Sequence, residues 1–231
     1  MILLHAPELD ELSPCPYLPG KEKQFEQFLA DDLNEKEMAC LLAEGWRKFG
    51  IHFFRPSCPE CKECLPLRVK ARSFIPSKSQ KRNLRNNSAI EVKFGPLSYS
   101  PRIYEIYQAH SMERFSQTTS LEDFLFAFYS PSCPAIQSEY YLDGELIGAG
   151  FLDKSADSLS SVYFFFDPDY SKLGIGTFSI LKEIEHARSL GLPYYYLGYY
   201  VPGCKRMAYK DTFRPREHYD WEGGNWVDED N

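Results

Sequence analysis

Apolar residues recur at helical spacing in the first part of the chain, after a short apolar start and a loop rich in proline and glycine. A capping box formed by Asn34 and Glu37 precedes this pattern, which predicts a helix that continues through Phe49 and stops at Gly50. Residues 51–55 are strand-like and lead into a loop with three cysteines. The N-terminal part is therefore predicted to contain both helix and strand.

A proline-rich break near residues 96–101 separates the N-terminal part from the rest of the chain. Residues 90–94 have the pattern of a strand that ends at Gly-Pro, and Ser100 and Ser120 each start a helix. We place the boundary between two lobes in the loop between that strand and the first of these helices. The chain is therefore predicted to form two packed lobes, residues 1–96 and residues 97–231.

Strand patterns dominate the second lobe. A buried strand, a Gly-x-Gly turn, a helix and a final strand follow a hairpin centred on Asp143-Gly144; the four strands are 135–142, 145–152, 159–166 and 194–199. The pattern predicts an α+β fold with a mixed sheet flanked by helices, and its order resembles the core of the GNAT acyltransferases. In that fold the turn with Gly174 and Gly176, just after Lys172, offers backbone N–H groups to phosphates of the acyl carrier.

The most basic segment of the chain joins the cysteine loop to a predicted helix. Leu65–Ile90 contains seven Lys and Arg residues and no acidic residue. Its first part alternates charged and apolar residues, as a strand with one wet, positive face does. A capping box at Ser77 and Gln80 then starts a helix. Four cations share one face of this helix: Lys78, Lys81, Arg82 and Arg85.

The charge of this segment is opposite to that of the remaining chain. The net charge is −7 and the segment contributes +7, so the other residues carry −14. A protein this acidic is not a general polyanion binder. Like charges at helical spacing repel, and cations near a helix N-terminus oppose its dipole, so we expect an anion to neutralise this face. A solvated charged face is the alternative to docking of a defined nucleic acid.

Cysteine usage indicates a reducing compartment. Seven cysteines are present, the start of the chain lacks the features of an export signal, and no apolar run is long enough to span a membrane. We therefore expect a cytoplasmic protein with free thiols or metal ligands. Cys58, Cys61 and Cys64, with the distant Cys15, provide four ligands for a structural zinc ion or an iron–sulfur cluster. Thiols without a metal are the alternative.

Four motifs in a fixed order carry a resemblance to a known family. They lie between Cys15 and Glu217 and read C-P-Y-L-P-G, R-P-x-C-x-x-C-x-x-C-x-P-x-R, F-x-P-S-K-S-Q-K-R-x-x-R-N and L-G-Y-Y-V-P-G-C-K-R-M-A-Y-K-x-x-F-R-P-x-E. Together they resemble the arginyltransferase-like aminoacyl-tRNA–protein transferases, and the short chain resembles their bacterial branch, the aspartate/glutamate leucyltransferases. The resemblance implies transfer of an amino acid from tRNA to the α-amino group of a protein that starts with Asp or Glu. This transfer marks the acceptor for N-degron degradation, and leucine as the donor is implied by the branch alone.

Residues near the last strand suit such a reaction. An aminoacyl ester is already activated, so no cofactor is needed, and the acceptor α-amine, with a pKa of about 7.7–8.0, is partly neutral near pH 7. A modest base and one donor to the oxyanion then suffice. We assign Lys210 as a charge-bearing partner and Tyr199 or Tyr209 as the donor. The alternative is that these tyrosines belong to an aromatic core.

The acidic side chain of the acceptor requires a cation. A bidentate arginine matches a carboxylate best, and we choose Arg68 first, then Arg214 and Arg216. Two other functions remain open. An acetyl-CoA-dependent GNAT N-acetyltransferase would use the glycine turn but leave the basic helix without a role. A non-catalytic RNA-binding module would leave the second lobe unexplained.

The basic helix yields a first prediction. Replacing Lys78, Lys81 and Arg82 together by Glu is expected to raise the apparent KM for charged tRNA steeply, because phosphate contacts release counterions. The effect is expected to shrink as salt rises, while the thermal stability stays nearly unchanged. Steady-state transfer assays at low and high salt measure both trends, and an unchanged KM at low salt would contradict the hypothesis.

Overall fold

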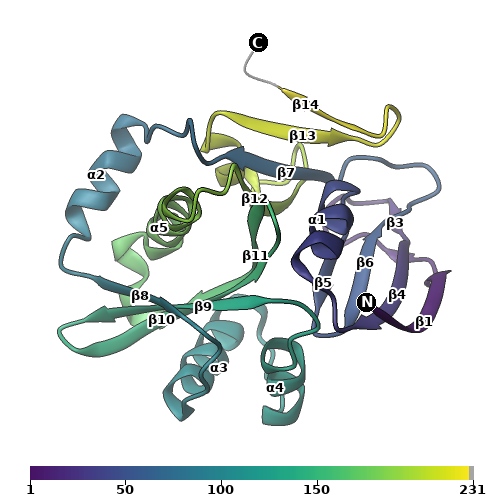
Figure 1. Cartoon of the computed structure of the whole chain (residues 1–231). Helices are drawn as coiled ribbons and strands as arrows, with labels where there is room; N and C mark the ends of the chain where they lie inside the picture. Colours follow the sequence, from purple (N-terminus) through teal and green to yellow (C-terminus); the bar gives the residue numbers. More distant parts are fainter. Residues whose placement is uncertain (229–231) are drawn as a thin grey trace.

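The computed structural model describes residues 1–228, which form two main sheets with helices packed around them (Figure 1). The N-terminal sheet has four strands, in the order β1 (Ile2–Leu9), β4 (Phe25–Asp31), β6 (His52–Pro56) and β5 (Arg47–Phe49). A short ribbon pairs β2 (Ser13–Pro14) with β3 (Glu22–Lys23).

The larger sheet has eight strands within residues 1–228. Their order is β14 (Asn225–Asp228), β13 (Arg216–Asp220), β7 (Leu65–Lys70), β12 (Tyr194–Tyr200), β11 (Ser158–Phe166), β10 (Glu145–Lys154), β9 (Ala135–Leu142) and β8 (Glu91–Gly95). Strands β11 and β12 pair in parallel and the other neighbours pair antiparallel, so the sheet is mixed. The predicted α+β class, with a large mixed sheet flanked by helices, is confirmed.

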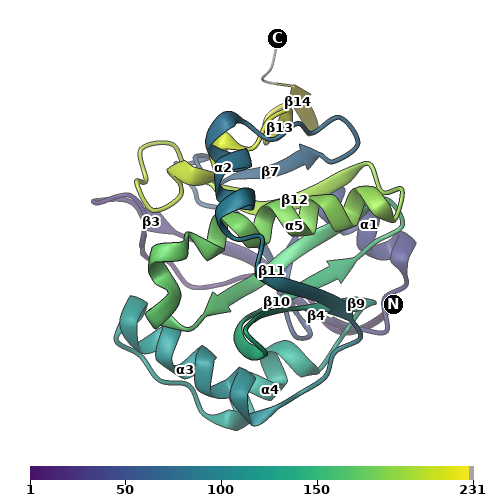
Figure 2. The ribbon, with the colours of Figure 1, turned by 90° about the vertical axis from the view of Figure 1, so that its left-hand side faces the viewer.

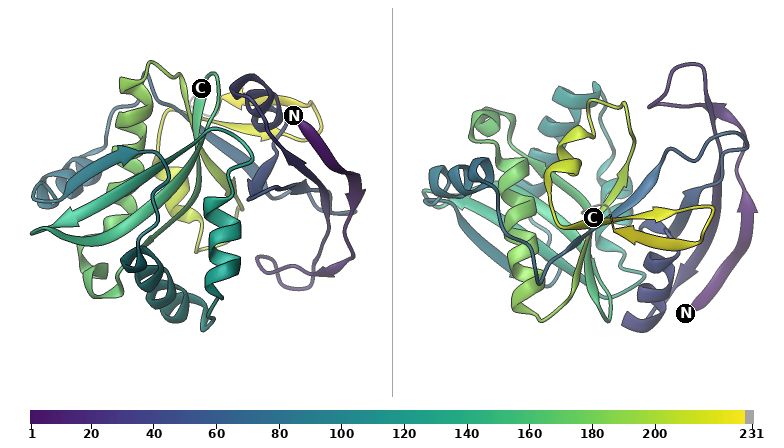
Figure 3. Two further views of the ribbon diagram at one scale, coloured as in Figure 1. Left: turned by 60° about the horizontal axis from the view of Figure 1, so that its bottom comes forward. Right: turned by 90° about the horizontal axis from the view of Figure 1, so that it is seen from above.

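Helices cover both faces of this sheet. They are α1 (Glu35–Ala43), α2 (Lys78–Asn86), α3 (Pro101–Phe115), α4 (Leu121–Tyr129), α5 (Ile175–Ser189) and the short 3₁₀ helices η1 (Pro168–Leu173) and η2 (Ala208–Thr212). Figure 2 shows α2 lying against α5. Helices α3 and α4 pack on the other face, against β10 and β11. The N-terminal sheet and α1 stand to one side (Figure 3).

Helix α5 is the centre of the largest apolar core. Its residues Leu181 and Ile184 pack with Leu67 of β7, Leu159 of β11 and Leu197 of β12. Burying one such side chain contributes roughly 1.5–3 kcal/mol, so α5 holds three neighbouring strands in place.

The two expected lobes share the larger sheet. Strand β7 comes from the range 1–96 but lies between β12 and β13, and β8 from the same range pairs with β9. Leu67 and Val69 of β7 are fully buried in the core that also contains α5. The sheet therefore does not divide at residue 96, where the range 97–231 begins.

Helix α1 is shorter than predicted. Its capping box is formed, but the helix ends at Ala43, and Arg47–Phe49 becomes strand β5. The chain turns at Gly45, which has a φ of +83° and lies so close to Trp221 that a Cβ would be 2.7 Å from the Trp221 ring. The predicted continuation to Phe49 was wrong, because tertiary contacts end the helix at this glycine.

The remaining predicted elements are present with small shifts of their ends. The hairpin of β9 and β10 turns at Asp143-Gly144, where both residues have positive φ. Strands β1, β4, β13 and β14 were not predicted; β1 is exposed along its whole length and β14 has only four residues. No helix within residues 1–228 is long and apolar enough to cross a membrane.

Gly150 in the middle of β10 provides a test of the core packing. A Cβ at this position would lie 2.5 Å from Oγ of Ser138 and 2.9 Å from Oε1 of Glu183. Gly150→Ala is therefore expected to lower the free energy of unfolding by about 1–3 kcal/mol. Gly95→Ala is the matched control, since nothing lies within 4 Å of its Cβ position. Chemical denaturation measures both, and equal stabilities of the two variants would contradict this packing.

Candidate functional site

The two parallel strands of the large sheet part soon after they meet. Strands β11 and β12 pair through Ser158–Ser160 and Tyr194–Tyr196 only, although β11 continues to Phe166. Beyond this point β12 stays paired with β7, with a shift of register between Tyr196 and Gly198. We call the place where β11 and β12 separate the seam. Polar backbone groups on both strands are available there.

Lys210 reaches the seam from η2. Its Nζ donates to the backbone oxygen of Tyr199 at 2.8 Å and lies 3.3 Å from the position that a Cβ on Gly198 would occupy. Gly198 has a φ of +86°, a conformation that favours glycine, so no side chain separates the amine from the strand. Burial, followed by the positive charge of Arg47, lowers the pKa of Lys210 to about 7. The side chain is therefore largely a neutral amine at slightly alkaline pH and can accept a proton.

Arg47 spans the seam from the opposite side. From β5 its Nη1 donates to Oγ of Ser160 at 2.7 Å, and its Nη2 donates to the backbone oxygen of Ser161. The same Nη2 is 3.7 Å from the Cβ position of Gly198. The sequence does not single out this residue, because nothing in the spacing around Arg47 differs from an ordinary strand.

The two tyrosines assigned as donors have different surroundings. The hydroxyl of Tyr199 donates to the backbone oxygens of Gly45 at 2.9 Å and Phe54 at 3.3 Å, and burial raises its pKa well above the usual value. Its proton is thus engaged in joining β12 to the N-terminal lobe. Tyr209 is exposed and precedes Lys210 in η2. Partial burial raises the pKa of the Tyr209 hydroxyl, which lies on the residue next to Lys210 in the chain.

A buried acid lies beneath the same strands. Glu183 of α5 accepts from the hydroxyl of Tyr195 on β12 and from Oγ of Ser138 on β9 at 3.3 Å. Burial raises its pKa to about 7, and these hydrogen bonds partly oppose the shift. The sequence carries a signal for Glu183, an acid within the apolar stripe of a helix, next to Ile184.

The basic face of α2 is exposed. Lys78, Lys81, Arg82 and Arg85 all face solvent, and none of them has an ion pair within residues 1–228. The predicted capping box of Ser77 and Gln80 is formed. The helix thus presents uncompensated positive charge at its surface.

Helix α2 also links two other parts of the predicted site. The Nε2 of Gln80 donates to the backbone oxygen of Thr212 at 3.1 Å, which ties α2 to the end of η2. The Nδ2 of Asn83 donates to the backbone oxygen of Gly174 at 3.1 Å, and Asn87 donates to that of Leu173 at 2.9 Å. The structure therefore brings the basic helix, the glycine turn and the Lys210 loop together.

The glycine turn is the start of α5. Gly174 has a φ of +64° and serves as the N-cap, and Gly176 has open space where a Cβ would be. The N–H groups of a first helical turn have no intrahelical partner and favour anions. Lys172 is exposed just before this turn. All three predicted residues thus lie where they can meet a phosphate that also contacts α2.

The three arginines chosen for the acceptor all have acidic partners. Arg68 donates to Glu217 at 2.5 Å and is stacked between Tyr194, 3.9 Å from the ring centre, and Trp226 at 4.2 Å. Arg216 is fully buried and pairs with Asp211, and Arg214 lies 3.5 Å from the same carboxylate. Only Arg214 keeps half of its side chain exposed.

The four predicted metal ligands line one pocket. It is enclosed by the β2–β3 ribbon and the loop after β6, and its lining includes Cys15, Cys58, Cys61 and Cys64. The backbone N–H of Gln24 donates to Sγ of Cys58 at 3.4 Å, and burial together with the charges of the other three cysteines raises the pKa of Cys64 to about 12. Within residues 1–228 no three His, Cys, Asp or Glu side chains converge tightly enough to hold a single metal ion. The thiols thus share a space without meeting at one point.

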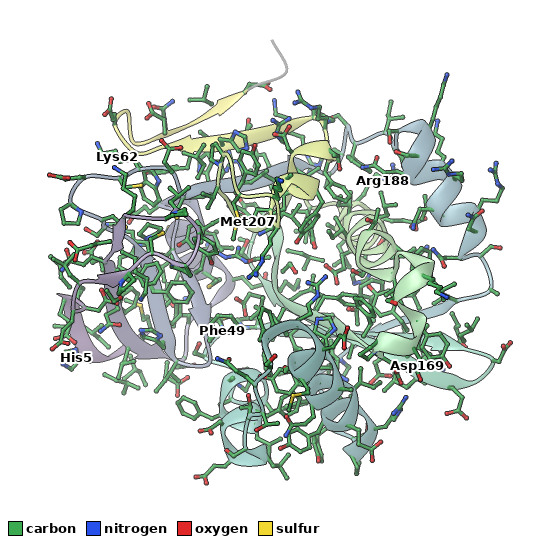
Figure 4. The ribbon with its side chains drawn as sticks, turned by 180° about the vertical axis from the view of Figure 1, so that it is seen from behind. His5, Phe49, Lys62, Asp169, Arg188 and Met207 are labelled. Atoms are coloured by element: carbon green, nitrogen blue, oxygen red, sulfur yellow. The ribbon has the colours of Figure 1, made fainter. Side chains whose placement is uncertain are left out.

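Figure 4 shows the molecule from behind, with Met207 among the labelled residues. Met207, in the loop just before η2, appears over the middle of the molecule, between the N-terminal sheet and α5. This loop joins β12 to η2 and so reaches the seam.

Known proteins match nearly the whole chain. Family models described as the N terminus and C terminus of arginine-tRNA-protein transferase match residues 13–82 and 100–220. The aspartate/glutamate leucyltransferase of Marinobacter nauticus is 34% identical over 218 residues, which cover 92% of this chain and 91% of that protein. The protein of the same name from Chromobacterium violaceum is 30% identical, over 92% of this chain and 89% of that protein.

Solved structures are more distant. L-PGS from Bacillus licheniformis has a TM-score of 0.46 at 14% identity, over 76% of this chain and 52% of that chain. The PaiA N-acetyltransferase from Thermoplasma acidophilum, in complex with coenzyme A, has a TM-score of 0.35 at 14% identity, over 44% of this chain and 75% of that chain. The sequence matches cover most of the chain, and on that basis this chain belongs to the aspartate/glutamate leucyltransferase branch of the arginine-tRNA-protein transferase family.

Proposed function

We propose that this protein transfers an aminoacyl group, leucyl by the names of its relatives, from aminoacyl-tRNA to the α-amino group of proteins that start with Asp or Glu. Family membership supports the reaction class. The observation that carries the proposal is the contact of α2 with both the glycine turn and the Lys210 loop. The product would be a protein marked for N-degron degradation, in the cytoplasm.

The tRNA end would be held by its phosphates. The exposed cations of α2 would contact the backbone near the acceptor end, and the first turn of α5 would receive one further phosphate. The order of the elements and the parting of β11 and β12 support a GNAT-like use of the fold, with the aminoacyl group entering the seam. Lys210 would then lie beside the ester.

The transfer itself requires movement of a single proton. The acceptor amine attacks the ester carbon, a C–N bond forms, and neutral Lys210 takes the proton that the amine loses. The C–O bond to the ribose then breaks, and Lys210 returns the proton to the ribose oxygen. Tyr209 would donate to the oxyanion during this step, a contribution typically of about 2.7–4 kcal/mol in other enzymes.

Acceptor choice would depend on a cation that still has exposed surface. Arg214 fits this condition better than Arg68 or Arg216, whose guanidinium groups are largely buried against carboxylates. A charge-assisted hydrogen bond is worth about 1.5–3 kcal/mol, so this residue would separate Asp from Asn by roughly 10- to 100-fold.

The cysteine pocket would hold a structural group. Four sulfurs around one cavity and a backbone N–H bond to Cys58 Sγ are features of iron–sulfur ligation, whereas zinc draws four sulfurs to about 2.3 Å from a single centre. We therefore favour a cluster over a single zinc ion. Its contribution would be to folding, since binding energy at such a site is folding energy.

Two alternative functions would use these residues differently. Acetyl transfer from coenzyme A would use the turn at Gly174 but leave the exposed cations of α2 without a ligand. RNA binding without catalysis would give Lys210 no reason to lie at the seam with a lowered pKa.

The function is tested by offering several donors and acceptors. Leucyl-, arginyl- and phenylalanyl-tRNA are each incubated with the protein and peptides that start with Asp, Glu, Asn or Lys. Transfer of Leu to the Asp and Glu peptides alone is the expected result, measured by mass spectrometry. Acetyl transfer without RNA would instead select the acetyltransferase.

The same assay tests the acceptor residue. Arg214→Ala is expected to lower kcat/KM for the Asp peptide by roughly 10- to 100-fold while the Asn peptide is hardly affected. Arg72→Ala is the control, because Arg72 is exposed and its guanidinium donates to the backbone oxygen of Gly191, with no ion pair within residues 1–228. An intact preference for Asp in the Arg214 variant would assign recognition to another cation.

The cysteine pocket is tested by analysis of protein purified without oxygen. Iron and acid-labile sulfide are expected in near-stoichiometric amounts, and Cys58→Ser is expected to lose them together with thermal stability. Cys40→Ser is the control, since Cys40 is exposed on α1, away from the pocket. Finding zinc in place of iron would change the assignment of the metal, and finding neither metal would support the alternative of free thiols.

A further inference from the structure

Arg47 places a second cation at the seam where Lys210 acts. The Nη2 of Arg47 and the Nζ of Lys210 lie 3.7 Å and 3.3 Å from the same point, the Cβ position of Gly198. Two cations so close together are unfavourable while both are charged, since like charges repel strongly away from water. Arg47 has firm anchors on β11, whereas Lys210 is held by one backbone oxygen.

The anchors of Arg47 fix its position relative to β11. Its guanidinium bridges from β5 to Ser160 and Ser161, the residues at which β11 leaves β12. Burial lowers the pKa of Arg47, but a guanidinium starts from so high a pKa that it stays protonated. The cost of burying two like charges is therefore relieved at Lys210, which can release its proton.

The other charged groups near Lys210 do not replace this effect. The titratable and charged groups around it are Arg47 from β5, Tyr199 from β12, Cys204 from the preceding loop, Tyr209 and Asp211 from its own 3₁₀ helix, and Arg216 from β13. Cys204 acts in the opposite direction and more weakly than Arg47. Asp211 is engaged by Arg214 and Arg216, and no acid pairs with Lys210 within residues 1–228.

We propose that Arg47 is a positioning residue of the transfer reaction, which braces the open seam and presents a fixed positive charge to Lys210. The charge keeps Lys210 ready to accept the proton of the acceptor amine. The brace keeps β11 and β12 apart, so that the ester can reach the amine. This inference rests on the proposed function, in which Lys210 is the base. It extends that function by naming the group that controls the base.

The first measurement is made on the protein without substrates. With lysine labelled at ¹³Cε, an NMR titration follows the protonation of Lys210, whose signal is assigned by its loss in Lys210→Met. In Arg47→Gln, which removes the charge but retains a donor for Ser160, the midpoint is expected to rise by about one pH unit or more. Arg47→Lys keeps the charge and is expected to stay near the wild-type midpoint, as is Arg72→Ala.

The second measurement is the pH profile of kcat/KM. Activity needs neutral Lys210, so the rate is expected to fall as pH drops through about 7, and the acidic limb of Arg47→Gln is expected to lie at higher pH. Ionisation of the acceptor amine also contributes to this limb, but equally in every variant. The difference between variants therefore reports Lys210 alone.

The two measurements separate the inference from the function on which it rests. An unchanged NMR midpoint in Arg47→Gln overturns the role of Arg47, whatever the activity does. A midpoint that rises while the pH profile stays fixed supports the charge contact and overturns Lys210 as the base. Unfolding of Arg47→Gln is detected by circular dichroism, and Arg47→Lys then carries the test: a midpoint that moves despite the retained charge contradicts the proposal.

Discussion

The structure depends on the parting of two parallel strands. Where β11 leaves β12 after Ser160, backbone groups that would otherwise pair are exposed to the interior, and unpaired polar groups there are costly. Arg47 satisfies the β11 side and Lys210 the β12 side. The interruption of the sheet leaves polar backbone groups that need partners, and it also brings two cations close to one point. The chemistry of the site follows from how this interruption is filled.

The surrounding elements serve to hold that arrangement. Tyr199 fastens β12 to the N-terminal lobe through two backbone oxygens, so β5, which carries Arg47, is fixed relative to the seam. Glu183 and Tyr195 form a buried hydrogen bond beneath it, and Gly150 leaves room for this acid. Polar groups in a core are tolerated when each has partners, and here they also set the position of the strands.

Helix α2 connects surface charge with the interior site. Its buried side is polar at Gln80 and Asn87, which bind backbone oxygens of the Lys210 loop and of the residue before the glycine turn. Its outer side carries the exposed cations Lys78, Lys81, Arg82 and Arg85. A ligand that neutralises this outer side would therefore also be held near the start of α5. Recognition of a polyanion and positioning of its end become one event.

The sequence alone determined the elements that depend on local patterns: the capping boxes of α1 and α2, the Asp-Gly hairpin, the basic face and the glycine turn. It also predicted Lys210 as a site residue, because the motif around it lies next to a strong strand, and the folded chain places that residue against β12. It could not find Arg47 or the partner of Arg68, since each acquires its surroundings from residues more than ten positions away. It extended α1 to Phe49, because helical spacing does not reveal that Trp221 closes on Gly45. Local spacing fixes which face a side chain is on, whereas desolvation, charge pairing and strand order depend on distant segments and are decided only when the chain has folded.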